Sequence, residues 1–580
     1  MSICERMKKG RRVPPDDIDD SKRYLDIYKL IALGLGGTLG QGIYVLTGQV
    51  ARELAGPAVT LCVFIAAVVS MLGGICYADL SSRVPRPGSA YIYSYMIMGE
   101  FVAFTVGWSM ILEYMTSTAS AAHSLAAYLD ALLDQRLSRA FQSVLTMNSK
   151  YTLGYPDFLA LGLILLSACV IAFGIKKSFW LNLSFIAVNL ITISLVFING
   201  TTISKIQNWS LKSKDVEEDI GVGGYFPYPI AKMFKGVAIC FFGFVGFDCI
   251  TSTAGEAINP THNIPMAIFA TMLMVFCTYS LMSTILTLMV PYYLINPITP
   301  LASAFQYHKM YHVHTFVTVG SVLALCASLL NSMFPLQRIL RAMAQDGFML
   351  KGYASVKGWT KSSMLATFFL TSIAAVGTLV LHFTFSIQLS IIGVLLDYTI
   401  VAIGVVMLHY KNDRKNENEA VEEINFKVVM RQICSGRHGK KANTVSNYIT
   451  RLFLIIFIVV SVLFCLAFKC FTITHQLWAI VLATCFAVLN IVCVIIIGIQ
   501  PQSSALPPFK TPLVPFIPCV SIWINIFLVS TLSWLCLVLY LIWMIVGYVV
   551  YFGVITVDFL EKRITSKLAK QMIDSFKFLV

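Results

Sequence analysis

The chain has 580 residues, of which 57% are hydrophobic and 12% are Asp, Glu, Lys or Arg, and its mean hydropathy is +0.76. Soluble domains carry roughly 25% charged residues, so this composition excludes a soluble enzyme, a disordered protein and, despite a net charge of +14, a nucleic-acid binder. It indicates an all-α polytopic membrane protein. Its partner is the lipid bilayer, and we expect it not to bind nucleic acid.

Apolar runs along the chain are long enough to cross a membrane many times. A helix needs about 20 apolar residues to span the hydrocarbon core, and helices satisfy every backbone amide there internally. The runs predict about fourteen transmembrane helices. They lie near residues 29–52, 57–79, 90–122, 157–174, 179–198, 234–255, 266–290, 317–343, 363–383, 387–408, 452–470, 474–498, 514–532 and 534–556.

Charge divides the chain into five segments. The N-terminal tail contains no apolar signal region, and the charged, aromatic-poor stretch after the tenth span is typical of a disordered cytosolic linker. The C-terminal tail is basic and amphipathic, so it lies either on the inner leaflet or free in solvent. The segments are the N-terminal tail 1–27, a ten-span core 28–409, the linker 410–450, four additional spans 451–557 and the C-terminal tail 558–580.

Basic residues orient these spans. Lys and Arg are concentrated in the N-terminal tail and in loops that follow even-numbered spans, which predicts that both termini are cytosolic. Two acceptor motifs for N-glycosylation, at Asn199 and Asn208, then fall on the outer face. We expect the plasma membrane as the location, with the lysosomal membrane as the alternative.

Glycines interrupt the first and sixth spans. The first contains five, from Gly34 to Gly42, and the sixth contains Gly243 and Gly246 followed by Asp248. Such glycines either let helices pack closely or let the backbone unwind. Breaks five spans apart are the pattern of a transporter built from inverted repeats with a site at the midplane.

Unwinding would expose backbone groups of opposite polarity. Free amides in the first span would bind a carboxylate beside a positive helix end, and free carbonyls in the sixth would bind an ammonium group. Together they describe a site for an α-amino acid, over which Phe242 could close as an aromatic gate. The amides belong to Thr38, Leu39, Gly40, Gln41 and Gly42, and the carbonyls lie near Phe242, Gly243 and Val245.

The chain resembles the cationic amino acid transporters of the amino acid–polyamine–organocation superfamily. The resemblance runs from about residue 26 to 556, apart from the linker, and is carried by stretches such as LGLGGTLGQGIYVLTGQVARELAGPA, YADLSSRVPRPGSAYIYSYMIMGEF and FFGFVGFDCITSTAGEAINP. It implies a LeuT-type 5+5 inverted-repeat core and transport by alternating access. It also implies that Thr38, Gly40 and Gly42 hold the carboxylate and that Glu100 is needed for transport.

Several positions depart from the family pattern. Cys326-Ala327 replaces an expected Ser-Thr pair in span eight, and Gly255 precedes Glu256 where relatives have two glutamates. These changes leave a carrier of neutral amino acids or polyamines open. Asn189 stands where some bacterial relatives have a proton-handling lysine, which favours uniport over proton coupling.

Acidic residues inside spans are costly and are therefore candidates for function. Asp248 is either part of the substrate site or a helix cap. At the cytosolic end, a structural cap or a gate ion pair is favoured over substrate contact for Glu256. Glu100 and Glu113 serve in gating or coupling, or in structural pairs. Asp397 is either a counter-ion for a cationic substrate or a partner of a nearby hydroxyl.

The sequence therefore predicts facilitated, potential-driven uniport of cationic L-amino acids such as arginine, lysine and ornithine. Besides other carriers, a transport-dead amino acid sensor remains an alternative. No nucleophile–base pair or phosphate loop indicates an enzyme. We expect no cofactor, no metal site and no accessory subunit.

Overall fold

The computed structural model describes residues 23–86, 88–144, 155–172, 175–212, 221–349, 364–411, 426–435, 442–503 and 508–577. Within these ranges the regular secondary structure is helical, with isolated bridge residues such as the pair Leu25 and Ala257, so the all-α prediction is confirmed. Eight of the described helical segments are long and apolar enough to cross a membrane, and two shorter apolar helices accompany them.

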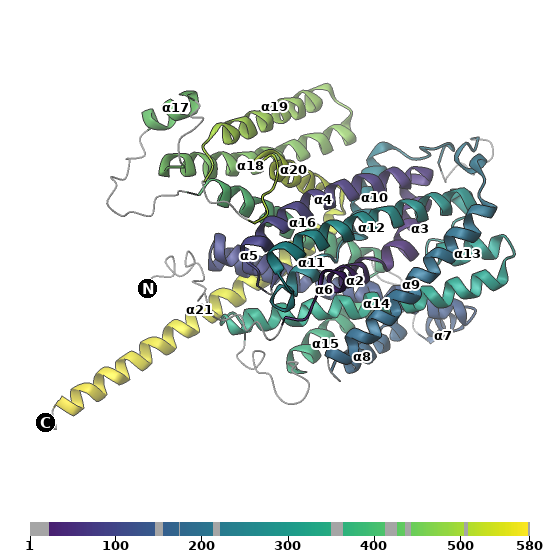
Figure 1. Ribbon diagram of the computed structural model, residues 1–580, viewed down its shortest axis with the longest axis horizontal. Helices are drawn as coiled ribbons and strands as arrows, with labels where there is room; N and C mark the ends of the chain where they lie inside the picture. The colour runs from purple at the N-terminus through teal and green to yellow at the C-terminus, as the bar shows by residue number, and fades with distance from the viewer. Residues whose placement is uncertain are drawn as a thin grey trace.

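Each of the fourteen predicted ranges overlaps a helix or a broken helix (Figure 1). The helices are α2 (Ile27–Thr38), α3 (Thr47–Val50), α4 (Val59–Arg83), α5 (Ser89–Ile97), α6 (Glu100–Leu132), α7 (Arg136–Val144), α8 (Phe158–Ala172), α9 (Ile175–Ile203), α10 (Ile230–Phe242), α11 (Asp248–Ser252), α12 (Pro260–Met289), α13 (Pro300–Tyr307), α14 (Tyr311–Gln345), α15 (Met364–Val380), α16 (Phe383–His409), α17 (Phe426–Ser435), α18 (Thr444–Thr474), α19 (Leu477–Ile499), α20 (Phe516–Thr531) and α21 (Trp534–Lys577).

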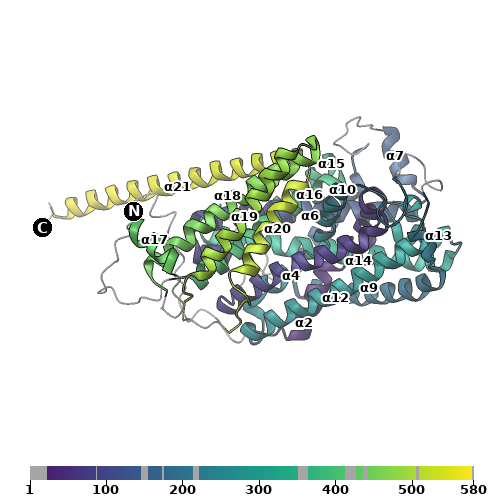
Figure 2. The ribbon, with the colours of Figure 1, turned by 90° about the horizontal axis from the view of Figure 1, so that it is seen from above.

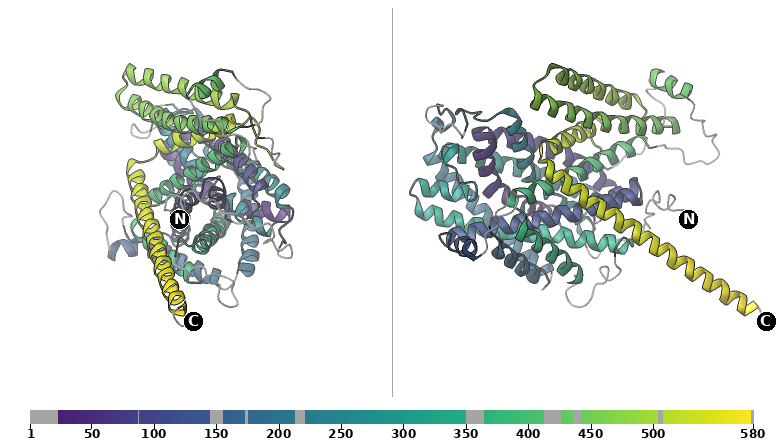
Figure 3. Two further views of the ribbon diagram at one scale, coloured as in Figure 1. Left: turned by 90° about the vertical axis from the view of Figure 1, so that its left-hand side faces the viewer. Right: turned by 180° about the vertical axis from the view of Figure 1, so that it is seen from behind.

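The helices up to α16 form one bundle around the broken first and sixth spans. Helix α12 packs on α4 and α2, and α14 and α16 both pack on α6. Helices α18 and α19 run along one flank of this bundle (Figures 1 and 3). Helix α20 connects that flank to the bundle, because it contacts both α16 and α18.

Helix α21 fastens the end of the chain to the bundle. The rings of Trp108 on α6 and Trp543 on α21 stack with centroids 4.8 Å apart. Each indole N–H donates to the backbone carbonyl of the other residue, at 2.9 and 3.0 Å. Beyond this contact α21 projects past the bundle (Figure 2).

The observed helices differ from the predicted segments in three places. The range 90–122 is divided between α5 and α6, because Gly99 adopts a left-handed φ of +101° that a continuous helix does not allow. Helix α21 continues to Lys577, well into the predicted C-terminal tail. Helix α17 lies within the predicted linker, of which 412–425 and 436–441 are outside the described residues.

Candidate functional site

The first break is a short bend held open by side chains of neighbouring helices. Helix α2 ends at Thr38, and the chain resumes as a π-helical turn, η2 (Gly42–Leu46). Three carbonyl groups around the bend accept hydrogen bonds from other helices, which keeps them from rejoining the helix. The donors are Asn331 Nδ2 to Gly36 O at 2.5 Å, Tyr279 Oη to Thr38 O at 3.0 Å and Asn189 Nδ2 to Leu39 O at 2.8 Å.

Part of the predicted carboxylate site is therefore already occupied by the protein itself. The Leu39 amide donates to Leu35 O at 2.8 Å, and the Gly40 amide donates to Thr38 O at 3.1 Å. The Thr38 hydroxyl donates to Gly34 O at 2.9 Å. The prediction of five free amides is therefore wrong for Leu39 and Gly40, because the bend is only about two residues long.

Gln41 offers a donor that the backbone argument missed. Its Oε1 accepts a hydrogen bond from the Ser120 hydroxyl at 3.1 Å. Its Nε2 is buried and has no partner in the described part of the chain. An unpaired buried amide donor is costly, so this group is well suited to meet a substrate carboxylate.

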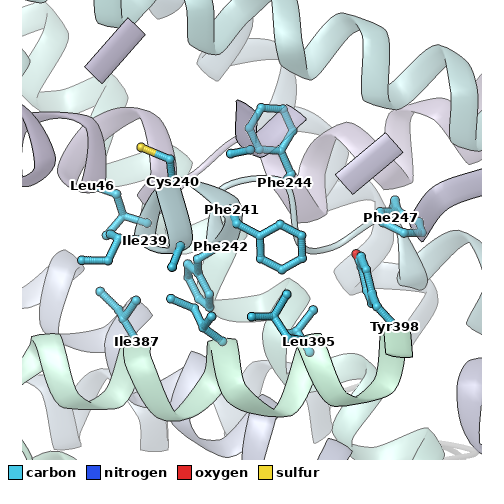
Figure 4. Packing of buried hydrophobic residues seen from close by; sticks show 14 of the residues in the cluster. Leu46, Ile239, Cys240, Phe241, Phe242, Phe244, Phe247, Ile387, Leu395 and Tyr398 are labelled. Carbon is cyan, nitrogen blue, oxygen red and sulfur yellow. The ribbon is translucent and has the colours of Figure 1, made fainter. Parts of the chain in front are cut away.

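The second break separates α10 from α11. Residues 243–247 form a turn in which Gly246 has a φ of +129°. The carbonyl of Phe242 accepts the Val245 amide at 3.1 Å, so it is not free for an ammonium group as predicted. Phe242 itself points toward α16, which carries Ile387 and Leu395 (Figure 4).

The two breaks touch each other through glycines. A Cβ on Gly37 would lie 2.8 Å from Gly246 O, and one on Gly246 would lie 2.5 Å from Gly37 O. Tyr279 of α12 fills the adjoining space, because a Cβ on Gly42 or Gly243 would meet its ring at 2.5 and 2.8 Å, respectively. Close approach of two backbones is a use to which only glycine is suited.

A cavity of about 40 Å³, which we call the central cavity, lies between the breaks. At 10–15 Å³ for each water it holds about three water molecules, so entry of a whole amino acid requires neighbouring side chains to move. Its lining comes from both breaks, α6 and α14. The lining residues are Gly37, Thr38, Gln41, Gly42, Glu113, Tyr114, Ser117, Phe242, Gly243, Val245, Gly246, Cys249, Ser328, Asn331 and Ser332.

Glu113 and Asp397 form a buried acidic pair at this cavity. Glu113 lines it from α6, while Asp397 lies on α16, close enough for the two carboxyls to interact electrostatically. Gly393, one turn before Asp397, allows this approach, because a Cβ there would lie 3.1 Å from Glu113 Cβ. Their side chains are 4% and 2% exposed, and neither Asp397 oxygen has a partner among the described donors.

Asp248 does not line the central cavity. It stands in the first turn of α11 and is buried, with its carboxyl facing the amides of Gly246, Cys249 and its own residue. The start of α11 has no side-chain cap bond, and Asp248 Oδ1 has no hydrogen-bond partner in the described part of the chain, so both roles expected for Asp248 stay predictions.

Asn189, Glu100 and Glu256 lie outside the cavity lining. Asn189 also accepts the Tyr44 hydroxyl at 2.7 Å, so both ends of its amide support the first break. Glu100 is buried in the first turn of α6, thirteen residues or about 20 Å below Glu113 along the helix. Glu256 Oε1 pairs with Arg338 Nη2 at 3.3 Å, at the same end of the bundle.

The two glycosylation candidates differ in their surroundings. Asn199 lies near the end of α9, half-buried, with Nδ2 donating to Leu195 O at 2.9 Å one turn back. Asn208 is buried, and its Nδ2 donates to Leu288 O on α12 at 2.7 Å. A glycan on Asn208 would have to break that contact between two segments.

Several residues of the site were missed by sequence reasoning, among them Tyr279, Ser328, Asn331 and Ser332. The polar residues of α14 stand within an apolar helix, as Cys326 and Ala327 do, but only Ser328, Asn331 and Ser332 reach the cavity. The one available signal was their polarity inside a span. Which of them faces the breaks depends on how α14 is rotated.

Comparison with known proteins identifies relatives over nearly the whole chain. Residues 25–435 match the family described as amino acid permease, and residues 509–558 match the C-terminus of such permeases. Proteins named cationic amino acid transporter 4 from Mus musculus and Homo sapiens are 32% and 33% identical, over 95% of this chain and 90% of each relative. The vacuolar cationic amino acid transporter 4 of Arabidopsis thaliana is 34% identical, over 67% of this chain and 63% of its own length.

Proposed function

We propose, from the premise that the chain belongs to the amino acid permease family, that it carries cationic L-amino acids by potential-driven facilitated uniport. Arginine, lysine and ornithine are the expected substrates. The observation that carries this proposal is the acidic pair Glu113–Asp397 behind a cavity formed by two broken helices. Family membership makes the chain an amino acid transporter and not an enzyme, while the cationic preference rests on that pair.

The two breaks offer partners for the α-carboxylate and the α-ammonium group, which all amino acids share. Gln41 Nε2 lacks a partner beside the first break, and Gly243 and Val245 line the cavity from the second. A carboxylate would bind on the first side, and an ammonium group would bind backbone carbonyls on the second. Phe242 would close over the bound molecule, and alternating access would follow from movement around a ten-span LeuT-type core in a protein of about fourteen spans.

The acidic pair suits a cationic side chain. The charged groups acting on the two carboxyls are each other and Asp248, and no basic side chain is among them in the described structure. Two like charges side by side in a buried site are unfavourable unless a cation or a proton neutralises them. The guanidinium or ammonium group of a substrate would supply the missing positive charge.

The membrane potential alone can drive uptake of a cationic substrate, so no proton or sodium gradient is needed. A membrane potential of 100 mV provides about 2.3 kcal/mol for each charge, which corresponds to roughly 50-fold accumulation. Asn189, a neutral residue engaged at both ends of its amide, offers no proton-carrying group at the position where relatives use lysine. Both points support uniport.

Orientation and location follow the distribution of basic residues. We infer that both termini are cytosolic and that the plasma membrane holds the protein, with the lysosomal membrane as the alternative. Of the two acceptor motifs we propose Asn199 as the glycosylated one, because the Asn208 amide is buried against α12.

Uptake into vesicles containing the purified protein tests this function. Labelled arginine is offered at clamped potentials of both signs and at two pH values. Uptake that follows an inside-negative potential and ignores a proton gradient is expected of a cationic uniporter. Uptake that requires the proton gradient would instead place the neutralising proton on the acidic pair and would refute uniport.

A substitution in the acidic pair tests the substrate class. Asp397→Asn keeps the shape of the side chain but removes its charge, so arginine should lose its attraction while citrulline, a neutral near-isostere, should not. We expect the preference for arginine over citrulline, measured as a ratio of uptake at low concentration, to fall by about tenfold, the equivalent of 1.4 kcal/mol. An unchanged ratio would show that Asp397 does not select the substrate.

Two other outcomes would redefine the function. If the wild-type protein carries citrulline or leucine at a rate equal to that of arginine, the chain is a carrier of neutral amino acids. If arginine binds without time-dependent accumulation above empty vesicles, the chain is a sensor.

A further inference from the structure

A second, larger cavity lies at the end of the bundle where α7 and α13 are found, opposite α17 (Figures 1 and 2). Its volume is about 320 Å³, within the range of small-molecule pockets. Its walls come from the second half of the broken first span, α6, α7 and the start of α16. We call it the second cavity.

Acidic side chains give the second cavity its charge. Glu53, Asp130 and Asp157 line it, and no Lys or Arg occurs among the lining residues that the structure describes. Two of these carboxylates are engaged by nearby backbone: Asp130 Oδ1 accepts the Leu137 amide at 2.9 Å, and Asp157 Oδ1 accepts the Ala160 amide at 2.9 Å. Glu53 is exposed, and its one contact is a weak bond from Gln49 Nε2 at 3.5 Å.

Two buried polar atoms at this cavity lack a hydrogen-bond partner among the residues that the structure describes. His123 is 5% exposed, and its Nδ1 lies 2.9 Å from Asp157 Oδ2. Since a carboxylate only accepts, Nδ1 carries a proton, and Nε2 has no partner in the described part of the chain. On a singly protonated ring this nitrogen is a hydrogen-bond acceptor. Gln49 is 7% exposed; its Nε2 donates to Thr384 Oγ1 at 3.1 Å, and its Oε1 is likewise without a partner.

The chemistry of the missing ligand follows from these atoms. A carboxylate, an amide oxygen and the Nε2 of a singly protonated imidazole together favour a positively charged group with several N–H donors. A guanidinium group has five such donors and an ammonium group has three. A metal ion is a poorer match, because no group of three or more His, Cys, Asp or Glu in the described ranges is arranged to hold one.

The second cavity also lies in line with the central cavity. Val45 and Gln49 line the second, while Gly42, one turn earlier on the same broken span, lines the central one. On α6, Ser117 belongs to the central cavity and Ser124, two turns later, to the second. The two sites are therefore about 5–11 Å apart along the helices.

We propose that the second cavity is a separate binding site for the guanidinium or ammonium group of an organic cation, which a cationic amino acid occupies before it reaches the central cavity. The ligand class takes its relevance from the proposed function, whereas the site rests on residues that the central cavity does not use. Glu53 supplies the charge, and His123 and Gln49 supply the acceptors.

Agmatine, the decarboxylated form of arginine, tests the second cavity directly. It keeps the guanidinium group but has no carboxylate for Gln41. Binding of labelled agmatine to the full chain in lipid nanodiscs is measured at equilibrium and low salt. We expect saturable binding that Glu53→Gln weakens roughly three- to fivefold, the range of a partly exposed ion pair, and that Glu53→Lys weakens further.

Asp134→Asn is the matched control. Asp134 is an exposed acid at the same end of the bundle but outside the cavity lining, and Asn tolerates its left-handed φ of +54°. Its agmatine affinity should equal that of the wild type. In vesicles, Glu53→Gln should raise the KM for arginine without lowering the maximal rate.

Failure of this proposal is separable from failure of the proposed function. Absent agmatine binding, or equal binding by the Glu53→Gln and Asp134→Asn variants, would refute the second site even if arginine is carried. Conversely, Glu53-dependent agmatine binding by a chain that carries no arginine would keep the site and remove the transport function.

Discussion

Gly42 and Tyr279 show how a single missing side chain shapes the site. Tyr279 is fully buried, and its hydroxyl is bound to Thr38 O at the first break. A Cβ on Gly42 would lie 1.8 Å from that hydroxyl and 2.5 Å from the ring. Neither the ring nor the break can give way without losing the hydrogen bond that keeps the backbone bent.

Gly42→Ala should therefore destabilise the protein by about 1–3 kcal/mol, the usual cost of overpacking, and lower the midpoint of thermal unfolding in detergent. Gly162→Ala on α8 is the control, since a Cβ there meets nothing within 4 Å. Alanine in an open helical position should be neutral or slightly stabilising. Equal midpoints for the two variants would mean that Tyr279 does not confine Gly42.

At the scale of elements, the start of α2 is tied across the end of the sixth span. The amides of Tyr24 and Leu25 both donate to Glu256 O at 3.0 Å, and the Ile258 amide donates to Leu25 O at 2.9 Å. The Tyr24 hydroxyl donates to Glu256 Oε2 at 2.9 Å, and Arg338 of α14 pairs with Oε1. This latch joins three segments at one end of the bundle.

Glu256→Gln removes the charge that Arg338 pairs with but keeps the backbone bonds. Hydrogen exchange at residues 24–26 and 256–258 should then accelerate, by no more than about fivefold because exposed ion pairs contribute up to 1 kcal/mol. Asp134→Asn, at the opposite end, should leave these amides unchanged. Exchange as slow as in the wild type would show that the backbone bonds alone hold the latch.

The latch should be insensitive to pH over the physiological range. Burial and the neighbouring Glu256 raise the pKa of Tyr24 from 10.0 to about 12. Because the folded pKa lies above the unfolded value, the hydroxyl's contribution is complete below pH 10 and is lost as the pH rises through 12. Protection, corrected for intrinsic exchange, should be the same at pH 6 and pH 9.

At the scale of the whole molecule, Asp79 joins the ten-span bundle to the C-terminal helices. It is completely buried at the end of α4. Its carboxylate accepts from Arg83 Nε at 2.6 Å, from His409 Nε2 at 2.8 Å and from the Thr511 amide at 2.8 Å. The ends of α4 and α16 and the segment that leads into α20 therefore depend on one charge.

Asp79→Asn should destabilise the whole protein by about 3 kcal/mol, because it replaces a buried carboxylate that three donors share and leaves the half-buried Arg83 guanidinium without its counter-ion. The expected readout is a lowered midpoint of thermal unfolding in detergent. Asp134→Asn removes an exposed carboxylate and should shift the midpoint little. A similar small shift for both variants would show that packing of α20, rather than Asp79, holds the C-terminal helices.

The sequence by itself determined the features that depend only on residues close to one another along the chain. Apolar runs identified the helical segments, and glycines located both breaks, at Gly40 and near Gly243. It also selected Glu113 and Asp397 individually, because an acid inside an apolar run is visible without any structure. The order of motifs pointed to the family that the comparisons then established.

Only the tertiary structure decided which groups meet. Asn189, Tyr279 and Asn331 reach the first break from three other helices, which consumes groups that looked free in the sequence. Packing of α16 on α6 brings Asp397 to Glu113, whereas Asp248 is buried outside the lining of the central cavity. The physical reason is that helix rotation and contact fix hydrogen-bond partners over hundreds of residues, and no local pattern records them.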